Sequence, residues 1–360
     1  MGPRNQIVSI SRSVAIMAMV LGHAFVCTKV ECWVNQFDMA VFFVCAGFCF
    51  NIGYLERPLD FVKRRVVGIV VPFIFWVSVC IILHNFFVRW GILAADGVYR
   101  GQDQHLYSAR EVLVNVGNAF LLRNSEQLLG GYWFLHDLFF VSLCAIGFFL
   151  LLCRVLKKSL RVGILLGLFL SGALILLGGG ARPIIGLFLF MIGVWMREMN
   201  VINFLSRLPF YTKMSVLVVL GLLFWRMGMC GMLLSNPERM KIPEFLIASI
   251  SGVILVFLVS EKLSASPCLA GILSYVGDAS LTILTLHLFA FKFFSWLLLL
   301  LGVPGRLSDF PTLPLSAIGR SGYFVVGVVL PIAFHLLYKY IIRKFDENCK
   351  GRLLCGQSKI

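Results

Sequence analysis

The chain has 360 residues, of which 59% are hydrophobic and 14% charged, and it carries a formal net charge of +15. Together with a mean hydropathy of +0.92, this balance excludes an ordinary soluble globule and is typical of a polytopic membrane protein. The basic residues lie scattered at the ends of apolar segments, which argues against nucleic acid as a partner. We therefore expect an all-α helical bundle in the bilayer, with residues 1–360 forming one membrane domain and no separate soluble domain.

Apolar runs along the chain predict ten transmembrane helices, with both termini on the same side. The spans are expected at residues 7–27, 38–54, 66–88, 132–153, 162–179, 183–199, 212–234, 243–260, 277–301 and 321–342. The first should remain uncleaved, because Arg12 interrupts its apolar run and no small-residue cleavage site follows. Short Lys and Arg clusters fall on the side of the N-terminus, so the positive-inside rule places both termini in the cytoplasm. The short, glycine-bearing spans 38–54 and 183–199 are candidates for tilted or broken helices.

The longest polar connection, residues 89–131, is expected to be an extracytoplasmic loop too short for a core of its own. Helical periodicity over 109–122 predicts an interfacial helix within it. The chain has 11 cysteines, mostly inside apolar runs, where cysteine behaves as a small buried hydrophobe. Their spacing predicts no metal site. Cys27 and Cys32 flank an outer loop and are the one pair considered for a disulfide.

The first span contains the stretch RSVAIMAMVLGH, which places Arg12 and His23 inside an apolar helix. Inserting an arginine at the centre of a membrane helix costs about 2.5–3.5 kcal/mol, so such a residue is a functional candidate by default. Eleven residues at about 100° each make about three turns, so both side chains project from one face, about 16 Å apart along the axis. Alone, Arg12 would suit a snorkelling anchor and His23 an interfacial histidine. Their shared face instead favours one internal track through the membrane.

A basic cluster of Lys63, Arg64 and Arg65 opens the third span. By itself it would be an ordinary positive-inside cluster. Beside Arg12 it predicts a site for a polyanionic cytoplasmic ligand, since the planar guanidinium group suits phosphate recognition.

The fourth span opens with GGYWFLHDLFF, which brings His136 and Asp137 into the bilayer region. An aspartate at this depth must find a partner. Asp137 or Asp38 could orient the imidazole of His23 by accepting one of its ring N–H groups. Pairing of Asp137 with a different side chain would serve equally well, the alternatives being His136, Lys292 and Arg226.

The ninth span places His287 near the middle of the membrane and Lys292 closer to the outer side. A lone histidine on an apolar helix is more often a packed, hydrogen-bonded residue than a catalyst. A second buried histidine, in a chain that already has His23, favours a functional role for His287. No inverted repeat is visible in the hydropathy, which weakens a transporter interpretation.

These residues together resemble membrane-bound acyltransferase family 3, whose members O-acylate cell-envelope glycans and other acceptors. The resemblance rests on the first-span motif of a basic residue, ten residues and histidine, and on four blocks in the same order, at 39–50, 61–76, 130–140 and 275–289. Family members commonly carry an acidic residue three positions before the basic one. Here that position is Ser9, so any salt bridge holding Arg12 must come from elsewhere.

The resemblance implies transfer of an acyl group other than amino-acyl, with acetyl as the first choice, from cytoplasmic acyl-CoA to a hydroxyl of an envelope saccharide or lipid-linked glycan. No tightly bound cofactor is expected. His23 would act as general base or carry the acyl group, His287 would orient the thioester or stabilise the oxyanion, and Asp137 completes the catalytic candidates. The CoA phosphates would be held by Arg12, Arg64 and Arg65.

Two other classes of function are considered. A transporter or flippase of a lipid-linked saccharide would use the buried charges to bind cargo, and a membrane assembly partner would need no chemistry. The expected location is the bacterial inner (cytoplasmic) membrane, with several passes. The identity of the acceptor, the acyl chain and the formation of a homo-oligomer are left open by the sequence.

Overall fold

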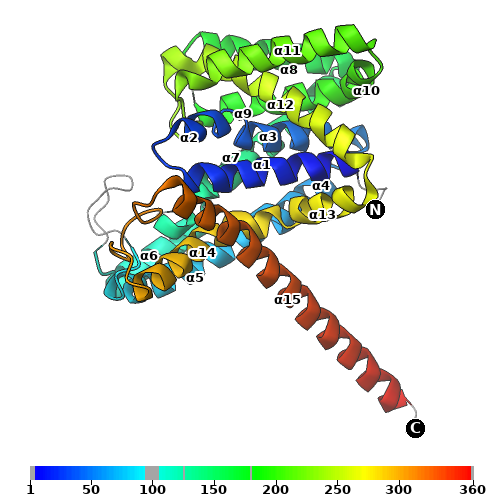
Figure 1. Ribbon diagram of the computed structural model, residues 1–360. Helices are drawn as coiled ribbons and strands as arrows, with labels where there is room; N and C mark the ends of the chain where they lie inside the picture. Colours follow the sequence, from blue (N-terminus) through cyan, green and yellow to red (C-terminus); the bar gives the residue numbers. More distant parts are fainter. Residues whose placement is uncertain (1–4, 94–104, 125, 179–180, 358–360) are drawn as a thin grey trace.

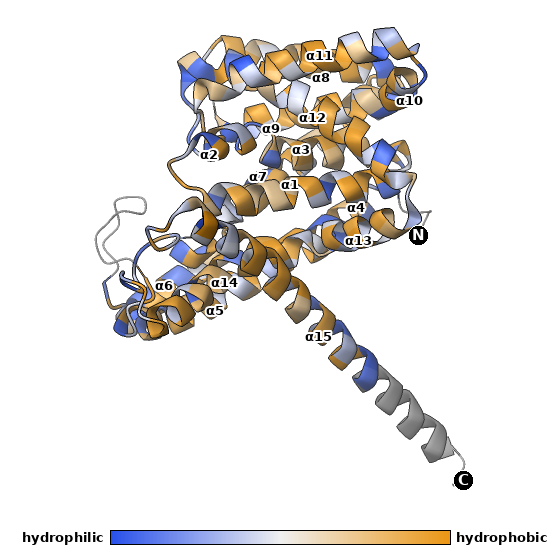
Figure 2. Ribbon diagram, viewed as in Figure 1, coloured by the Kyte–Doolittle hydropathy of each residue, from blue (hydrophilic) through white to orange (hydrophobic). Residues whose placement is uncertain are grey.

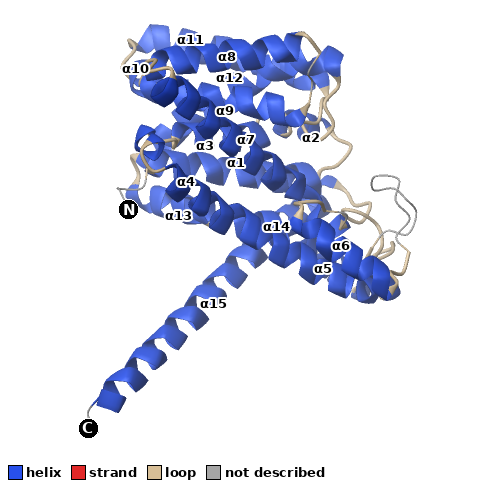
Figure 3. Ribbon diagram, turned by 180° about the vertical axis from the view of Figure 1, so that it is seen from behind, coloured by secondary structure: helices blue, strands red, loops and turns tan. Residues whose placement is uncertain are grey.

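The computed structural model describes residues 5–93, 105–124, 126–178 and 181–357, with side chains described up to Lys344. Within these ranges the chain is helical and contains no strand (Figure 3). The α-helices are α1 (Gln6–Ala24), α2 (Lys29–Val34), α3 (Asp38–Phe48), α4 (Pro58–Arg65), α5 (Val71–Arg89), α6 (Ala109–Phe120), α7 (Trp133–Phe149), α8 (Leu160–Leu176), α9 (Arg182–Glu198), α10 (Val201–Ser206), α11 (Phe210–Met227), α12 (Ile242–Ser264), α13 (Pro267–Asp278), α14 (Ser280–Leu300) and α15 (Ala317–Gln357).

Seven helical segments in the described part of the chain are long and apolar enough to cross a membrane. The other three predicted spans are also helical but shorter: α8 and α9 have 17 residues each, and α3 has only 11. At 1.5 Å per residue α3 extends about 16 Å, well short of a hydrocarbon core of about 30 Å. The prediction at 38–54 is therefore wrong in its length, because the α-helix ends at Phe48. The count of ten spans and the cytoplasmic termini stay predictions.

Helix α1 lies in the middle of the bundle, where 67% of its apolar window is buried, against 6% for the span that contains α11. It packs against α3, α12, α13, α14 and α15 (Figure 1). In Figure 1 the N-terminal end lies beside α4 and α13, and α2 and α6 lie at the opposite end of the bundle. Hydrophilic residues gather toward these two ends, and hydrophobic residues dominate the helices between them (Figure 2). Lipid contact accounts for the exposed apolar faces of the peripheral helices.

Helices α3 and α9 pack very closely against each other. A Cβ atom at Gly47 would overlap the backbone carbonyl of Phe190, and one at Gly193 would overlap that of Val44. In a membrane, helices gain nothing from the hydrophobic effect when they leave lipid and contact each other, so their association depends on close packing. Small residues such as these glycines allow that close approach. The short helix α3 is thereby held firmly between α1 and α9.

Between α4 and α5 the chain forms one π-helical segment, Val66–Val70, followed by Pro72 at the start of α5. This π-helical segment begins directly after Arg65. Such π segments often occur at functional sites.

At the opposite end of the bundle, α6 is fastened to α5. Its N-terminus has a complete capping box of Ser108 and Glu111, and its prediction as a helix is confirmed. Buried His84 of α5 bonds the carboxylate of Glu126 at 3.1 Å and stacks on the ring of Tyr107. The disulfide considered between Cys27 and Cys32 does not form, and both thiols are free.

Candidate active site

Two imidazole rings from distant parts of the sequence meet inside the bundle. His23, in the last turn of α1, and His287, in α14, share a hydrogen bond of 2.9 Å between Nδ1 of His23 and Nε2 of His287. His287 is fully buried, while His23 is partly exposed to a cavity. The first-span histidine is therefore held in place by the ninth predicted span.

The surrounding hydrogen bonds assign the tautomers of both rings. Nδ1 of His287 lies 3.1 Å from the carbonyl oxygen of Ile283 and 2.9 Å from that of Leu284. Carbonyl oxygens only accept, so Nδ1 of His287 carries the hydrogen and its Nε2 has a lone pair. His23 must then donate from Nδ1, which leaves a lone pair on Nε2 of His23. No described residue bonds that nitrogen, so it is the one available to a substrate.

The role predicted for His287 does not match this geometry. Both of its ring nitrogens are occupied, one by backbone carbonyls of its own helix and the other by His23. Neither can reach a thioester or donate to an oxyanion while these bonds persist. His287 instead positions His23 and fixes its tautomer.

The three predicted arginines come together at the other end of the first-span track. Arg12, Arg64 and Arg65 line one cavity of about 400 Å³, bounded by α1, α3, α4, α7, α13 and α14. Arg64 is exposed and donates to the hydroxyl of Tyr54 at 3.0 Å. We call this hollow the inner cavity, and Cys45 and Cys49 also line it. Three guanidinium groups around one hollow can bind an anion of several charges.

Arg12 is held by Ser280, the first residue of α14. Its Nη2 donates to Oγ of Ser280 at 2.6 Å, and Asp278 lines the same cavity. Ser9, which stands where the family commonly has an acid, donates to Oδ1 of Asp278 at 3.4 Å. Gly277 permits this contact, because a Cβ there would overlap the backbone carbonyl of Ser9. The acidic group near Arg12 thus comes from α13.

His23 lines a second, outer cavity of about 600 Å³. Its walls include the side chains of Asp38, Trp133 and Arg182 and the loop residues Phe310 and Pro311. Lys292 holds that loop in place, since its Nζ donates to the carbonyl oxygens of Leu307 and Asp309, both at 2.8 Å. Lys292 is therefore not a partner of Asp137.

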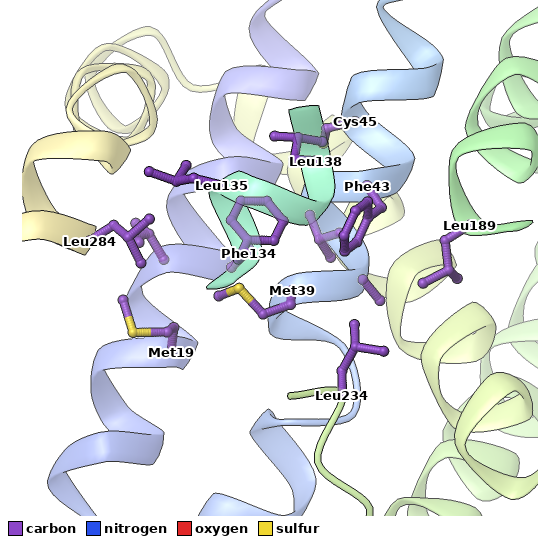
Figure 4. Close-up of a cluster of buried hydrophobic side chains, with 14 of the residues drawn as sticks. Met19, Met39, Phe43, Cys45, Phe134, Leu135, Leu138, Leu189, Leu234 and Leu284 are labelled. Atoms are coloured by element: carbon purple, nitrogen blue, oxygen red, sulfur yellow. The ribbon is translucent and has the colours of Figure 1, made fainter. Parts of the chain in front are cut away.

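The inner and outer cavities meet at Met39 and Leu284, which line both. Figure 4 shows Met39 and Leu284 in one cluster of buried hydrophobic side chains, together with Met19 and Phe134. Met39 is 7% exposed, Leu284 5% and Met19 3%. The continuous passage expected from the sequence is divided into two cavities in this structure, and the buried apolar side chains of Met39 and Leu284 lie where the two cavities adjoin.

Asp137 does not orient His23. Its Oδ1 lies 2.8 Å from Nδ1 of His136, one of the partners considered for it, and its Oδ2 lies 3.2 Å from Nε of Arg182. Asp137 is fully buried, whereas Arg182 reaches over the ring of Trp133 and lines the outer cavity. The carboxylate therefore holds a cation at the cavity wall. Arg226, another partner considered, is exposed on α11 and lines neither cavity.

Comparison with protein families decides the class of this site. A family model described as an acyltransferase domain, of the acyltransferase 3 type, matches residues 6–338. The chain belongs to acyltransferase family 3. It is a membrane-bound acyltransferase with several membrane passes. Comparisons with curated proteins and with solved structures find no match.

Among the described residues, Arg12, Arg64 and Arg65 line one cavity, and His23, which is hydrogen-bonded to buried His287, lines the other. Among the described residues, no group of three or more His, Cys, Asp or Glu side chains could hold a metal ion. Sequence reasoning missed Arg182 and Ser280, which act on Asp137 and Arg12. Ser280 lies in the block at 275–289 and could have been suspected from it, whereas no sequence signal links Arg182 to Asp137.

Proposed function

We propose that the protein transfers an acetyl group from cytoplasmic acetyl-CoA to a hydroxyl of an envelope saccharide or lipid-linked glycan, in the cytoplasmic membrane of a bacterium. The observation that carries the proposal is the meeting of the two cavities at Met39 and Leu284. Arg12, Arg64 and Arg65 line the inner cavity on one side of this contact. His23, whose Nε2 is free, lines the outer cavity on the other side. Family membership favours acyl transfer over the transporter and over the assembly partner considered above.

The inner cavity suits the phosphates of CoA. Arg12, Arg64 and Arg65 offer planar donors that pair with phosphate oxygens, and the cavity has one acid, Asp278. The narrow pantetheine arm would extend from there toward His23. Along α1 this distance is about 16 Å, at 1.5 Å per residue. The thioester would pass between Met39 and Leu284, whose side chains must move aside.

The chemistry then follows from the histidine pair. The acceptor hydroxyl, in the outer cavity, gives its proton to Nε2 of His23 as its oxygen bonds the thioester carbonyl carbon. The carbon–sulfur bond breaks, and the thiolate takes the proton back from His23, which yields the ester and free CoA thiol. Alternatively Nε2 of His23 attacks the thioester carbon and the CoA thiolate leaves; the acyl group then passes from Nε2 to the acceptor oxygen, whose proton goes to the thiolate, so that the ester and free CoA thiol again result. In both routes Nδ1–H of His23 donates to His287, which stabilises the positive charge on the ring.

The test is acetyl transfer by the purified protein in lipid nanodiscs, with radiolabelled acetyl-CoA and a lipid fraction from envelope membranes. Label should enter the glycan fraction, and CoA thiol should be released in equal amount. His23→Ala should abolish both signals without lowering the amount of folded protein. His335→Ala serves as the matched control, since His335 bonds Thr282 and lines neither cavity. Full activity of His23→Ala would refute the proposed mechanism.

A second measurement tests the inner cavity. Replacing Arg64 and Arg65 together with glutamine should raise the KM for acetyl-CoA at least tenfold, since one hydrogen bond to a charged group contributes about 1.5–3 kcal/mol. The KM for the acceptor should not change. Saccharide movement across the bilayer without any dependence on CoA would instead support the transporter.

A further inference from the structure

The outer cavity contains an acidic group that the proposed reaction does not use. Asp38 begins α3 and lines the same cavity as His23, although it is only 4% exposed. Its Oδ1 accepts the backbone N–H of Met39 at 2.5 Å. No described Lys, Arg or His side chain forms an ion pair with it, and its Oδ2 has no donor among the described residues.

A carboxyl group so deeply buried is costly unless donors surround it. The carboxylate of Glu31, which lines the same cavity, has two donors, because it accepts the backbone N–H of Cys27 at 2.6 Å and a hydrogen bond from the side chain of Asn35. Arg182, the one cation on the cavity wall in the described part of the chain, is paired with buried Asp137. Among the Asp, Glu and Arg side chains described in this cavity, Asp38 therefore keeps the most hydrogen-bonding capacity for a ligand.

The position of Asp38 along the chain matters as much as its charge. The next residue is Met39, which lines both cavities and forms part of the barrier between them. A ligand that bonds the Asp38 carboxylate thus lies beside the point where the acyl group would arrive. Trp133 also lines this cavity and adds apolar surface that the ring of a saccharide can contact.

Resting on the proposed function, we propose that Asp38 binds a hydroxyl of the acceptor next to the reacting one, and that the acceptor is an uncharged or amino saccharide rather than an acidic one. The cavity combines two acids with an arginine that Asp137 already neutralises. A uronic or sialic carboxylate placed there would meet like charge, and like charges in a desolvated site disfavour binding. A hydroxyl or an ammonium group supplies the donors that Asp38 lacks.

The test uses the full-length protein in nanodiscs with radiolabelled acetyl-CoA and three octyl glycosides that enter the membrane: a glucoside, a 2-amino-2-deoxyglucoside and a glucuronide. For the unaltered protein, kcat/KM for the first two should exceed that for the glucuronide by at least about tenfold, the effect expected for one lost buried hydrogen bond or one close like charge. A preference for the glucuronide, or equal values for all three, overturns the proposal.

The variant Asp38→Asn keeps the size of the side chain and removes its charge. The KM for octyl glucoside should rise about tenfold, and the ratio of neutral to acidic acceptor should fall toward one, while the KM for acetyl-CoA stays unchanged. Asp60→Asn is the matched control, since Asp60 is exposed on α4 and lines neither cavity. An Asp38→Asn enzyme with unaltered acceptor KM and unaltered ratio overturns the role of Asp38.

The experiment separates this inference from the function on which it rests. Release of CoA thiol reports consumption of the donor, and label in the glycoside reports the acceptor. Thiol release without label in any of the three glycosides overturns the acceptor class and leaves acyl-CoA as donor. Absence of both signals in the unaltered protein, with any acceptor, contradicts acyl transfer from acetyl-CoA itself. Should Asp38→Asn fail to fold, the preference of the unaltered protein among the three glycosides still decides whether the proposed acceptor class is right.

Discussion

His287 offers the sharpest test of the site, because its contribution can be worked out from one hydrogen bond. Its Nε2 accepts from Nδ1 of His23 at 2.9 Å, and thereby keeps the lone pair of His23 on Nε2. In His287→Leu the Nδ1–H of His23 loses its buried acceptor. An unsatisfied buried donor costs about 1–3 kcal/mol. The ring can avoid that cost by moving its proton to Nε2, where it blocks the base.

At about 1.36 kcal/mol for each factor of ten in rate, this loss lowers kcat by about 5- to 150-fold, with the larger value if the wrong tautomer dominates. His287→Gln should recover part of the rate, because an amide carbonyl oxygen can accept from Nδ1 of His23. The KM for acetyl-CoA should stay the same in both variants, since the arginines of the inner cavity are untouched.

The assay is the initial rate of CoA thiol release with saturating acceptor, normalised to folded protein measured by size-exclusion chromatography. His335→Leu is the control for loss of a histidine elsewhere, as His335 bonds Thr282 between α15 and α14. A His287→Leu enzyme with the kcat of the unaltered protein would refute the positioning role. Equal losses for the Leu and Gln variants would show that His287 acts through packing and not as a hydrogen-bond acceptor.

Three further predictions concern the contact between the two cavities, the packing of α13 on α1, and the start of α6. Leu284→Trp should fill the contact between the cavities. Isothermal titration should then still detect CoA binding, while acetyl transfer falls below detection. Normal transfer by this variant would exclude passage of the thioester between Met39 and Leu284. Gly277→Ala must push α13 away from Ser9, and overpacking of this kind costs about 1–3 kcal/mol, so the thermal midpoint should fall and the KM for acetyl-CoA should rise as Ser280 leaves Arg12. Glu111 has its pKa lowered to about 2, first by the side-chain hydroxyl of Ser108 and then by the Ser108 backbone N–H and His105. A carboxyl group with a lowered pKa stabilises the folded state above its ordinary pKa and loses that contribution as the pH falls toward the lowered pKa. The protection factors of the amide hydrogens at the start of α6, which are corrected for the intrinsic pH dependence of exchange, should therefore fall between about pH 4 and pH 2 and stay constant from pH 5 to 8.

Local periodicity was sufficient to predict the parts of the site that one helix carries. Arg12 and His23 share a face of α1 because their spacing matches three turns, and Arg64 and Arg65 occupy the end of α4 that a basic cluster before an apolar run predicts. The structure brings all three arginines to one cavity. Charges near a helix end and the period of a helix are properties of short segments, which is why the sequence reveals them.

The partners of these residues depend on contacts between distant segments. His23 and His287 are separated by 264 positions, and the carboxylate of Asp137 pairs with Arg182 of α9 rather than with His23. Which helix faces which is set by close packing, as at Gly47 and Gly193, and no periodicity encodes it. The short helix α3 is a similar case, because an apolar run continues beyond Phe48 although the helix ends there.

The closed contact between the cavities bears on why an enzyme, and not a transporter, suits this bundle. An open track from Arg12 to His23 would conduct water and ions down the membrane potential. Met39 and Leu284 prevent this with apolar side chains, and the flexible thioether of Met39 can change rotamer without moving a helix. On the proposed mechanism, the pantetheine arm opens the contact and fills it at the same time, so the barrier to ions persists during the reaction. A saccharide is too wide and too polar for that passage, and carrying it would need one group of helices to rock against another. Moving only the acyl group to the far side, and leaving both large substrates on their own sides, requires no motion beyond these side chains.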